Sequence, residues 1–315
     1  MNVVLDVREL QPLLRELNLE VATAVTQLPG GSSPVFRIDL ADGKRLNLKT
    51  YSYGLGAPRK EAYAISYLAT LGLPVTQYLV LDGTRKWLPF CFAITSHLPG
   101  VSADTLKDHS KIADVYRQMG ALLRKLHAVR MPGYGCMDDS GIVAPAHTNV
   151  DFLRRIIGDA FERFQHFGGD AALAERLRAV VAGRFDEIAM HTAGPVFAHN
   201  DLHPGNVLVT QTADGSLVLS GVIDFGNAHA ADAVFDLAKA LFCSMHQAPN
   251  CRAPMLEGYG AIDHPDPEGA LWYYTLLHRM IMWAWLRQVE AIPAAETPSG
   301  LIDDLQEMAN EAWRG

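Results

Sequence analysis

The chain has 315 residues, of which 49% are apolar and 20% are charged, and its formal net charge is −8. This composition excludes a disordered or fibrous chain, and the acidic balance argues against nucleic acid as the main partner. Four cysteines without close spacing predict neither a zinc site nor a disulfide scaffold, and the N-terminus lacks the basic and apolar regions of a signal peptide, so we expect a cytoplasmic globular protein with two lobes.

Three short runs rich in β-forming residues open the chain and predict an antiparallel meander. They cover residues 21–26, 35–40 and 45–51, and turn residues separate them. The first turn contains Gly30, Gly31, Ser32 and Ser33. Because glycine lets backbone N–H groups approach phosphates closely, we expect this turn to cover the phosphates of a nucleotide. The alternative is a turn that only joins two strands.

Lys49 lies in the third run, where alternation places Leu46 and Leu48 on one face and Lys49 on the other. A helix is predicted over residues 58–72, with Glu61 in its first turn. Kinases use a strand lysine steadied by a helical glutamate to hold nucleotide phosphates. The alternatives are a solvated edge lysine and an acid favoured by the helix dipole.

Two more runs complete the sheet, at residues 75–81 and 90–95, and the segment 96–100 then breaks it. We expect a hinge here, between an N-terminal lobe of residues 1–99 and a C-terminal lobe of residues 100–315. Helical periodicity dominates the second lobe, at residues 112–129, 151–167, 171–191, 234–245, 268–289 and 301–312. The predicted class is therefore α+β, and no apolar stretch predicts a membrane span because the richest, residues 271–286, is too short.

The most informative stretch is His199-Asn200-Asp201-Leu202-His203-Pro204-Gly205-Asn206, followed later by Asp224-Phe225-Gly226. Pro204 and Gly205 break regular structure, so we expect a loop that aims Asp201 and Asn206 into one space. Two β-rich runs, 207–209 and 217–223, flank a turn at residues 213–216. They predict a hairpin that returns Asp224 to the neighbourhood of Asn206.

These three polar residues match the needs of phosphoryl transfer from ATP. The reaction requires an acceptor for the proton of the attacking hydroxyl and oxygen ligands for Mg²⁺. We assign the first role to Asp201, as base or orienting carboxylate, and the second to Asn206 and Asp224. The alternative is an acidic surface loop that matches by accident. His199 is assigned to structure, and a satisfied loop histidine is the default for His203.

The same motifs resemble the aminoglycoside phosphotransferase and choline-kinase-like family of small-molecule kinases. The family pattern H-G-D-x-H-x-x-N, followed by I-D-F/W-G/E, matches here except that Asn200 replaces the usual glycine. Asn tolerates left-handed backbone angles better than most residues. The resemblance covers nearly the whole chain, and it implies a bilobal protein-kinase-like fold with a small antiparallel-sheet N-lobe and a larger, mainly helical C-lobe.

The resemblance also implies roles for residues outside the two motifs. In such kinases, backbone groups of the hinge hydrogen-bond adenine, which points to the main chain of Ser96 and Leu98. Asp236 is expected to hold the catalytic loop by hydrogen bonds. Only residues 227–233 separate Gly226 from the next predicted helix, which leaves no room for the activation segment of a protein kinase and suits a small acceptor.

The phosphoryl acceptor is a small-molecule hydroxyl that the sequence does not name. Residues 251–315 hold ten acidic and four basic residues, which favours a cationic acceptor such as an amino sugar or amino alcohol, although an ordinary solvated acidic face is the alternative. Aromatic residues that could stack on the acceptor, or simply pack the core, are Trp272, Tyr273, Trp283 and Trp285. Choline, homoserine, a ketosamine or an antibiotic remain open as acceptors, as does a non-catalytic nucleotide-binding module. The oligomeric state and the choice of ATP over GTP also stay open.

Overall fold

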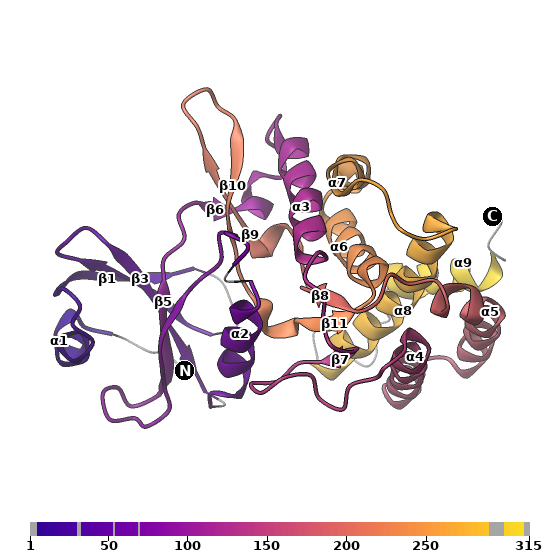
Figure 1. Cartoon of the computed structure of the whole chain (residues 1–315), viewed down its shortest axis with the longest axis horizontal. Coiled ribbons are helices and arrows are strands. Elements are labelled where there is room, and N and C mark those ends of the chain that lie inside the picture. Colours follow the sequence, from indigo (N-terminus) through magenta and orange to yellow (C-terminus); the bar gives the residue numbers. More distant parts are fainter. Residues whose placement is uncertain (1–4, 30–32, 53, 69, 290–298, 312–315) are drawn as a thin grey trace. The chain divides into compact units, whose positions relative to one another are not determined.

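The computed structural model describes residues 5–29, 33–52, 54–68, 70–289 and 299–311. The chain divides into two compact units, and each takes several segments of the sequence (Figure 1). The first unit contains Met1–Thr105, Met137–Gly141 and Gly205–Asn227. The second contains Leu106–Cys136, Ile142–Pro204 and Ala228–Gly315. The hairpin at residues 207–222 therefore belongs to the same unit as the N-terminal sheet. Our division at residues 1–99 and 100–315 stays a prediction.

A five-stranded sheet of order β1-β2-β3-β5-β4 forms the centre of the first unit, and every neighbouring pair is antiparallel. Its strands are β1 (Ala22–Leu28), β2 (Val35–Leu40), β3 (Arg45–Tyr51), β4 (Tyr78–Asp82) and β5 (Cys91–Ser96). Bulky side chains of β2 and β3 alternate between buried and half-buried positions, as the period of two predicts. The predicted antiparallel meander is confirmed.

Helix α1 (Val7–Glu16) supplies part of the core of this unit. Asp6 starts the helix with a capping box, because its side chain accepts from Arg8 while Glu9 reaches back to the Asp6 amide. The buried face of the helix carries leucines at positions 10, 13 and 14, which join Phe36, Ile38 and other sheet residues in one apolar cluster. The sequence analysis had not predicted this helix.

A second, three-stranded sheet in the first unit has the order β10-β9-β6. It combines the hairpin strands β9 (Val207–Gln211) and β10 (Leu217–Val222) with the short β6 (Val101–Ser102). Gly215 makes the hairpin turn with φ of 76°, a left-handed angle that glycine adopts without strain. The remaining elements of this part are α2 (Gly56–Ser66) and the 3-10 turns η1 (Ala103–Leu106) and η3 (Phe225–Asn227).

The second unit is mainly helical, as predicted. Its helices are α3 (Ile112–Leu126), α4 (Asn149–His166), α5 (Ala171–Ala189), α6 (Ala233–Gln247), α7 (Arg252–Tyr259), α8 (Pro267–Gln288) and α9 (Ser299–Asn310). A small antiparallel sheet of order β7-β11-β8 lies among them and contains β7 (Gly135–Cys136), β11 (His229–Ala231) and β8 (Val196–Ala198). The 3-10 turn η4 (Pro249–Cys251) belongs to this unit, whereas η2 (Pro204–Asn206) begins at its last residue before the hairpin and continues into the first unit.

Two glycines allow α3 and α7 to approach closely. A Cβ atom on Gly120 of α3 would lie 2.0 Å from the carbonyl oxygen of Met255, and one on Gly258 of α7 would lie 1.8 Å from that of Arg117. Any larger side chain would force the helices apart. Among the described residues, no helix has both the length and the apolar composition needed to cross a membrane.

Candidate active site

The backbone before Asp201 is fixed by a buried carboxylate in the second unit. Strand β8 ends at Ala198, and the next two amides, those of His199 and Asn200, donate to Asp236 at 2.9 and 2.7 Å. Asp236 lies in the first turn of α6 and is completely buried. The expectation that Asp236 holds the loop before Asp201 by hydrogen bonds is confirmed.

A third donor completes the surroundings of Asp236. His127 donates from Nε2 at 3.0 Å, and its Nδ1 lies 2.9 Å from the hydroxyl of Tyr259. Burial by itself would raise the pKa of the Asp236 carboxyl, but the hydrogen bond and charge of His127, together with the loop amide, hold that pKa below its ordinary value. The catalytic loop is thus tied to a carboxylate that stays ionised inside the protein.

Asn200 uses the left-handed conformation that glycine usually supplies in the motif. Its φ is 58°, an angle that Asn adopts more readily than other non-glycine residues. Its side-chain nitrogen lies 3.2 Å from Nδ1 of His229, whose Nε2 in turn lies 3.0 Å from Sγ of the exposed Cys136. The substitution therefore preserves the loop conformation and adds a contact to strand β11.

Asp201 follows directly and is half-buried. The charge of Asp201 affects the pKa of Cys243, which lies two turns along α6 from Asp236. Burial is the main cause that raises the pKa of the Cys243 thiol, and the carboxylate of Asp201 raises it further while Lys239 acts in the opposite sense. Asp201, Lys239 and Cys243 therefore share one neighbourhood beside α6.

In the first unit, the hairpin brings the two residues assigned to the metal to the same end. Val207 pairs with Val222, and the amide of Ile223 donates to the carbonyl of Asn206 at 3.0 Å. Asn206 is 8% exposed, whereas Asp224 is exposed and has a left-handed φ of 65°. The pairing that the sequence predicted for this hairpin is confirmed.

These two residues offer the oxygen donors that Mg²⁺ prefers. One carboxylate and one amide are few ligands, but Mg²⁺ usually takes one or two from protein and the rest from phosphates and water. The exposed carboxylate of Asp224 is open to such a shared ion. Asn206 and Asp224 fit the metal of a nucleotide complex.

Glu61 lies beside the segment that carries Asp224. Its Oε2 accepts from the hydroxyl of Tyr78 at 2.8 Å, and its Oε1 accepts from the amide of Phe225 at 3.3 Å. Burial is the main cause that raises the pKa of the Tyr78 phenol, and the charge of Glu61 raises it further. Glu61 therefore links α2 to the backbone next to Asp224.

Lys49 lies on β3 between β2 and β5, with Val35 and Ala93 as its cross-strand neighbours, so it is not an edge lysine. Its Nζ is 5.7 Å from the centre of the Tyr51 ring. Among the ion pairs of the described residues, none joins Lys49 to Glu61. The two side chains expected to pair are in one unit but are not in contact as an ion pair in this structure.

The other residues assigned to the nucleotide are less completely described. Gly30, Gly31 and Ser32 lie outside the described residues, and Ser33 forms a bend before β2. At the end of β5, the amide of Ser96 donates to the carbonyl of Gln77 at 2.9 Å. The Ser96 amide is therefore already used, and the expected contact with adenine would need the Ser96 carbonyl or the main chain of the half-buried Leu98.

Comparison with known proteins decides the family. The model of the phosphotransferase enzyme family matches residues 24–273. The chain belongs to this family. Its members are kinases of small molecules, so this chain is a phosphotransferase of that class. No curated protein sequence matches the chain.

Solved structures of family members share the fold of this phosphotransferase at low sequence identity. Aminoglycoside phosphotransferase APH(4)-Ia is 20% identical, with a TM-score of 0.68 over 97% of this chain and 100% of that one. A putative fructosamine-3-kinase from Thermobifida fusca is 18% identical, with a TM-score of 0.68 and the same coverage of 97% and 100%. A choline/ethanolamine kinase family protein from Mesorhizobium loti is 17% identical, with a TM-score of 0.62 over 91% and 88%. The kinase-like fold is therefore confirmed. A thermostable mutant of APH(4)-Ia is known in a ternary complex with ADP and hygromycin B.

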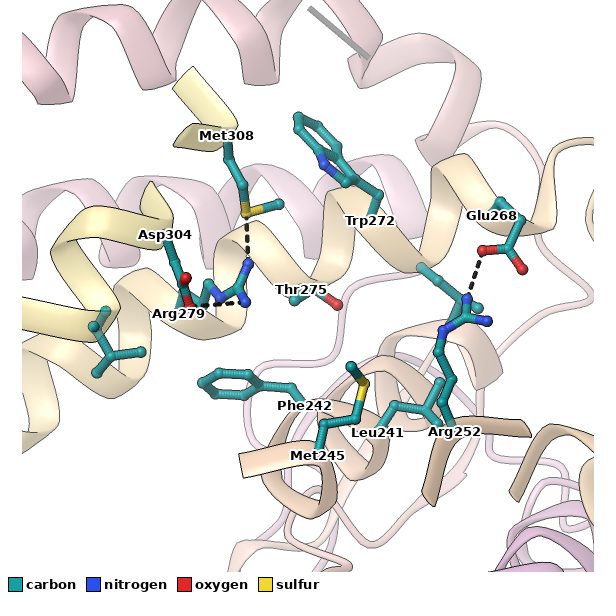
Figure 2. A pocket seen from close by; sticks show the side chains of 13 residues that line it. Leu241, Phe242, Met245, Arg252, Glu268, Trp272, Thr275, Arg279, Asp304 and Met308 are labelled. Atoms are coloured by element: carbon teal, nitrogen blue, oxygen red, sulfur yellow. Dashed lines mark hydrogen bonds and ion pairs between the residues drawn. The ribbon is translucent and has the colours of Figure 1, made fainter. Parts of the chain in front are cut away.

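The second unit of this phosphotransferase also contains a cavity of about 470 Å³ (Figure 2). Helices α6, α8 and α9 supply most of its walls, and α7 supplies Arg252. The lining is mainly apolar and includes the side chains of Phe242, Met245 and Trp272. Each of two arginines in the wall is paired with one carboxylate: Arg252 with Glu268 at 2.5 Å and Arg279 with Asp304 at 2.9 Å. The volume falls within the range of small-molecule sites.

Sequence reasoning missed several of these residues. Tyr78 and His127 are 17 and 109 residues from their carboxylate partners, so no local pattern signals the contacts. The cavity joins four helices whose lining residues are scattered over nearly seventy positions. The one usable signal was Trp272, which the sequence analysis did single out as a residue that could stack on an acceptor.

Proposed function

We propose that this protein transfers the γ-phosphoryl group of ATP to a hydroxyl of a small molecule. The observation that carries the proposal is the attachment of the loop before Asp201 to the buried, ionised Asp236. A catalytic base must be held in a fixed position to raise the rate, because alignment supplies much of the barrier reduction. An accidental surface loop has no need for such an anchor.

In the proposed reaction, the acceptor hydroxyl oxygen forms a bond to the γ-phosphorus of ATP while the bond from that phosphorus to the bridging oxygen of ADP breaks. Asp201 accepts the hydroxyl proton, or orients the hydroxyl until the proton leaves with the product. The proton then passes to water, and ADP departs with the electron pair of the broken bond. Most of the rate arises from positioning and charge neutralisation.

On the nucleotide side, Lys49 holds phosphate oxygens and Glu61 keeps the Asp224 segment in place. The turn with Gly30, Gly31, Ser32 and Ser33 covers the phosphates, and the main chain of Ser96 and Leu98 contacts adenine. Asn206 and Asp224 hold Mg²⁺. When bound, the ion neutralises charge on the phosphate oxygens.

The acceptor panel follows from the acidic C-terminal region and from the names of the structural relatives. It contains an aminoglycoside, an amino alcohol such as choline, a ketosamine, homoserine and a macrolide. A nucleotide-binding module without chemistry is the second candidate, since it shares the fold. The presence of Asp201 favours the enzyme because a binding module has no need for a base.

The test is Mg-ATP-dependent release of ADP in the presence of each acceptor, with Asp201→Asn as the control. We expect acceptor-dependent release that falls by about 10³-fold in the variant, while calorimetry shows that the variant still binds ATP. Wild-type activity in Asp201→Asn would disprove the role of the base. ATP binding without release across the panel, and without slow hydrolysis, would favour the binding module.

A further inference from the structure

Some of the acids that suggested a cationic acceptor are neutralised within the fold. Among the described residues between 251 and 315, four acids form ion pairs with arginines: Glu257 with Arg117, Asp266 with Arg184, Glu268 with Arg252 and Asp304 with Arg279. Two of these pairs lie in the wall of the cavity described above. The excess of acidic residues in the sequence therefore does not create an acidic cavity.

Arg279 is a cavity residue whose hydrogen-bond donors are incompletely satisfied, since its Nε is buried without a partner. Its Nη2 meets Asp304, but its Nη1 donates to the thioether sulfur of Met308 at 3.0 Å (Figure 2). A thioether is a weak acceptor, so this donor makes a poor bond for a guanidinium that is only 23% exposed. Burial lowers the pKa of Arg279, although Asp304 and Glu307 act in the opposite sense. An anionic oxygen in the cavity would replace sulfur with a charge-assisted hydrogen bond.

The carboxylates of the cavity do not need a ligand to satisfy their charge. Asp304 and Glu268 are 42% and 59% exposed, so water already solvates them. The guanidinium carbon of Arg279 also lies 5.8 Å from the centre of the Phe242 ring, so this ring already has a cation–π partner. The poorly satisfied, half-buried charge is positive, and it favours an anion over a cation.

The cavity lies close to the neighbourhood of Asp201 along α6. Phe242 lines the cavity. The next residue is Cys243, and the charge of Asp201 helps to raise the pKa of its thiol. Adjacent residues of a helix differ by about 100° in direction on a cylinder about 10–12 Å wide. A molecule bound in the cavity must therefore extend around α6 to bring a hydroxyl to Asp201.

We propose that the acceptor is an amphipathic hydroxyl compound whose apolar body fills the cavity between α6, α8 and α9 and whose single anionic group binds Arg279. This inference rests on the proposed function for its kinase part, but the binding part stands on the cavity alone. Trp272, Phe242 and Met245 contact the apolar body. The acceptor hydroxyl, at the far end from the anion, is the group phosphorylated.

The first test is direct binding without nucleotide, using a matched pair of probes. The pair consists of 12-hydroxydodecanoate and 12-amino-1-dodecanol, which share the chain and the hydroxyl but differ in charge. By calorimetry, we expect the anion to bind at least about tenfold more tightly, because its oxygen meets the half-buried charge of Arg279. Arg279→Met should remove that preference.

Two further variants control the test. Arg178→Met changes another arginine that lies over an aromatic ring, 4.8 Å from the centre of Phe161, in α5 and outside the cavity. It should bind the anion as the wild type does. Leu301→Trp narrows the cavity from α9 without changing Arg279, so it should weaken both probes and covers the case in which Arg279→Met does not fold.

The outcomes separate this inference from the proposed function. Tighter binding of the cation, equal binding by Arg279→Met, or no binding of either probe would overturn the inference. If Asp201-dependent ADP release occurs only with polycationic acceptors, the kinase stands and the anionic acceptor is wrong. If the anion binds through Arg279 but no acceptor supports ADP release, the binding site stands and the kinase is wrong. Anion binding with Asp201-dependent release supports both.

Discussion

Asp236 in the second unit and Glu61 in the first both hold a segment of the proposed site, but they do so differently. Asp236 is completely buried and accepts from two backbone amides and from His127. Glu61 is 8% exposed and accepts from one tyrosine and, at 3.3 Å, from one amide. Asp236 thus holds its segment with three short hydrogen bonds, whereas Glu61 holds its segment with a single, longer bond to the backbone.

The difference matches what each segment has to do. A catalytic base is useful only where the loop has one conformation, so its anchor must be complete before any ligand binds. The nucleotide side must admit a charged ligand, and there Asp224 is exposed and Lys49 faces a tyrosine ring. We infer that the second unit is preorganised, while the polar groups of the first unit take their final partners from the nucleotide.

The largest effect should come from breaking the complete anchor. Asp236→Ala leaves three donors inside the protein without an acceptor, and we expect a loss of about 3–5 kcal/mol in the free energy of unfolding. Urea denaturation measures this loss. Asp114→Ala is the control, because its pair with Arg117 is exposed and should contribute less than about 1 kcal/mol. Equal losses in the two variants would show that Asp236 is not an anchor.

Weakening the link in the first unit should affect the reaction more than the fold. Glu61→Gln keeps the shape but retains one acceptor oxygen and no charge, so the Tyr78 hydroxyl and the Phe225 amide can no longer both donate to a carboxylate. We expect the KM for ATP to rise or kcat to fall by about tenfold, the cost of one hydrogen bond to a charged group. Tyr78→Phe removes one bond but keeps the charged acceptor beside the Phe225 amide, so it should have the smaller effect. A stability loss as large as that of Asp236→Ala would contradict the comparison.

A smaller effect should distinguish Asp236 from a second buried carboxylate near it. Asp232 caps α6 by accepting from Val234 at 2.7 Å, and burial is the main cause that raises its pKa, whereas the pKa of Asp236 is lowered. The lowered pKa means that Asp236 stabilises the fold above the ordinary carboxyl range and loses this effect as pH falls through its folded pKa. The raised pKa means that Asp232 costs stability as pH rises from the ordinary carboxyl range through its folded pKa.

Neutral substitutions test these opposite signs. At pH 7, Asp232→Asn should change the free energy of unfolding by less than about 1 kcal/mol, because Asn also caps helices and removes a charge that burial disfavours. Asp236→Asn should cost more at pH 7, and its deficit should shrink as pH falls below about 4. Denaturation at pH 7 and at about pH 3 measures both. A deficit of Asp236→Asn that grows toward low pH would reverse the assigned sign.

The parts of the molecule that sequence predicted are those with local patterns. The motif from His199 to Asn206 and the hairpin behind it depend on turn residues and alternation, and both have the expected form. Helix α7 was missed because it has only eight residues, and α1 because its cap and its leucines were not combined into one pattern. The Glu61 partners could not be predicted, since the position of Tyr78 depends on how β4 pairs with β5.

The acidic C-terminal region shows the limit of composition. Counting charges favoured a cationic acceptor, but the count does not record which acids face arginines. Arg117 and Arg184 reach their partners from α3 and α5, at separations of 140 and 82 residues. Such pairs depend on helix packing, which no short stretch of sequence encodes. The chemistry of the cavity could therefore be inferred only from the folded chain.

The smallest effect should be a change in the reactivity of one thiol. Cys136 is exposed, whereas Cys91 and Cys251 are buried and burial raises the pKa of Cys251 to about 11, so a thiol reagent should modify Cys136 first. Cys136→Ser identifies this fast phase. Because Cys136 contacts His229 and His229 contacts Asn200, its rate reports the order of the catalytic loop. We expect Asp236→Ala, which releases the Asn200 amide, to change that rate several-fold, and Glu61→Gln to leave it unchanged, since Glu61 holds a segment of the other unit. If Glu61→Gln changed the rate as much as Asp236→Ala, the two anchors would not be independent, and the contrast between a preorganised loop and a nucleotide-completed site would fail.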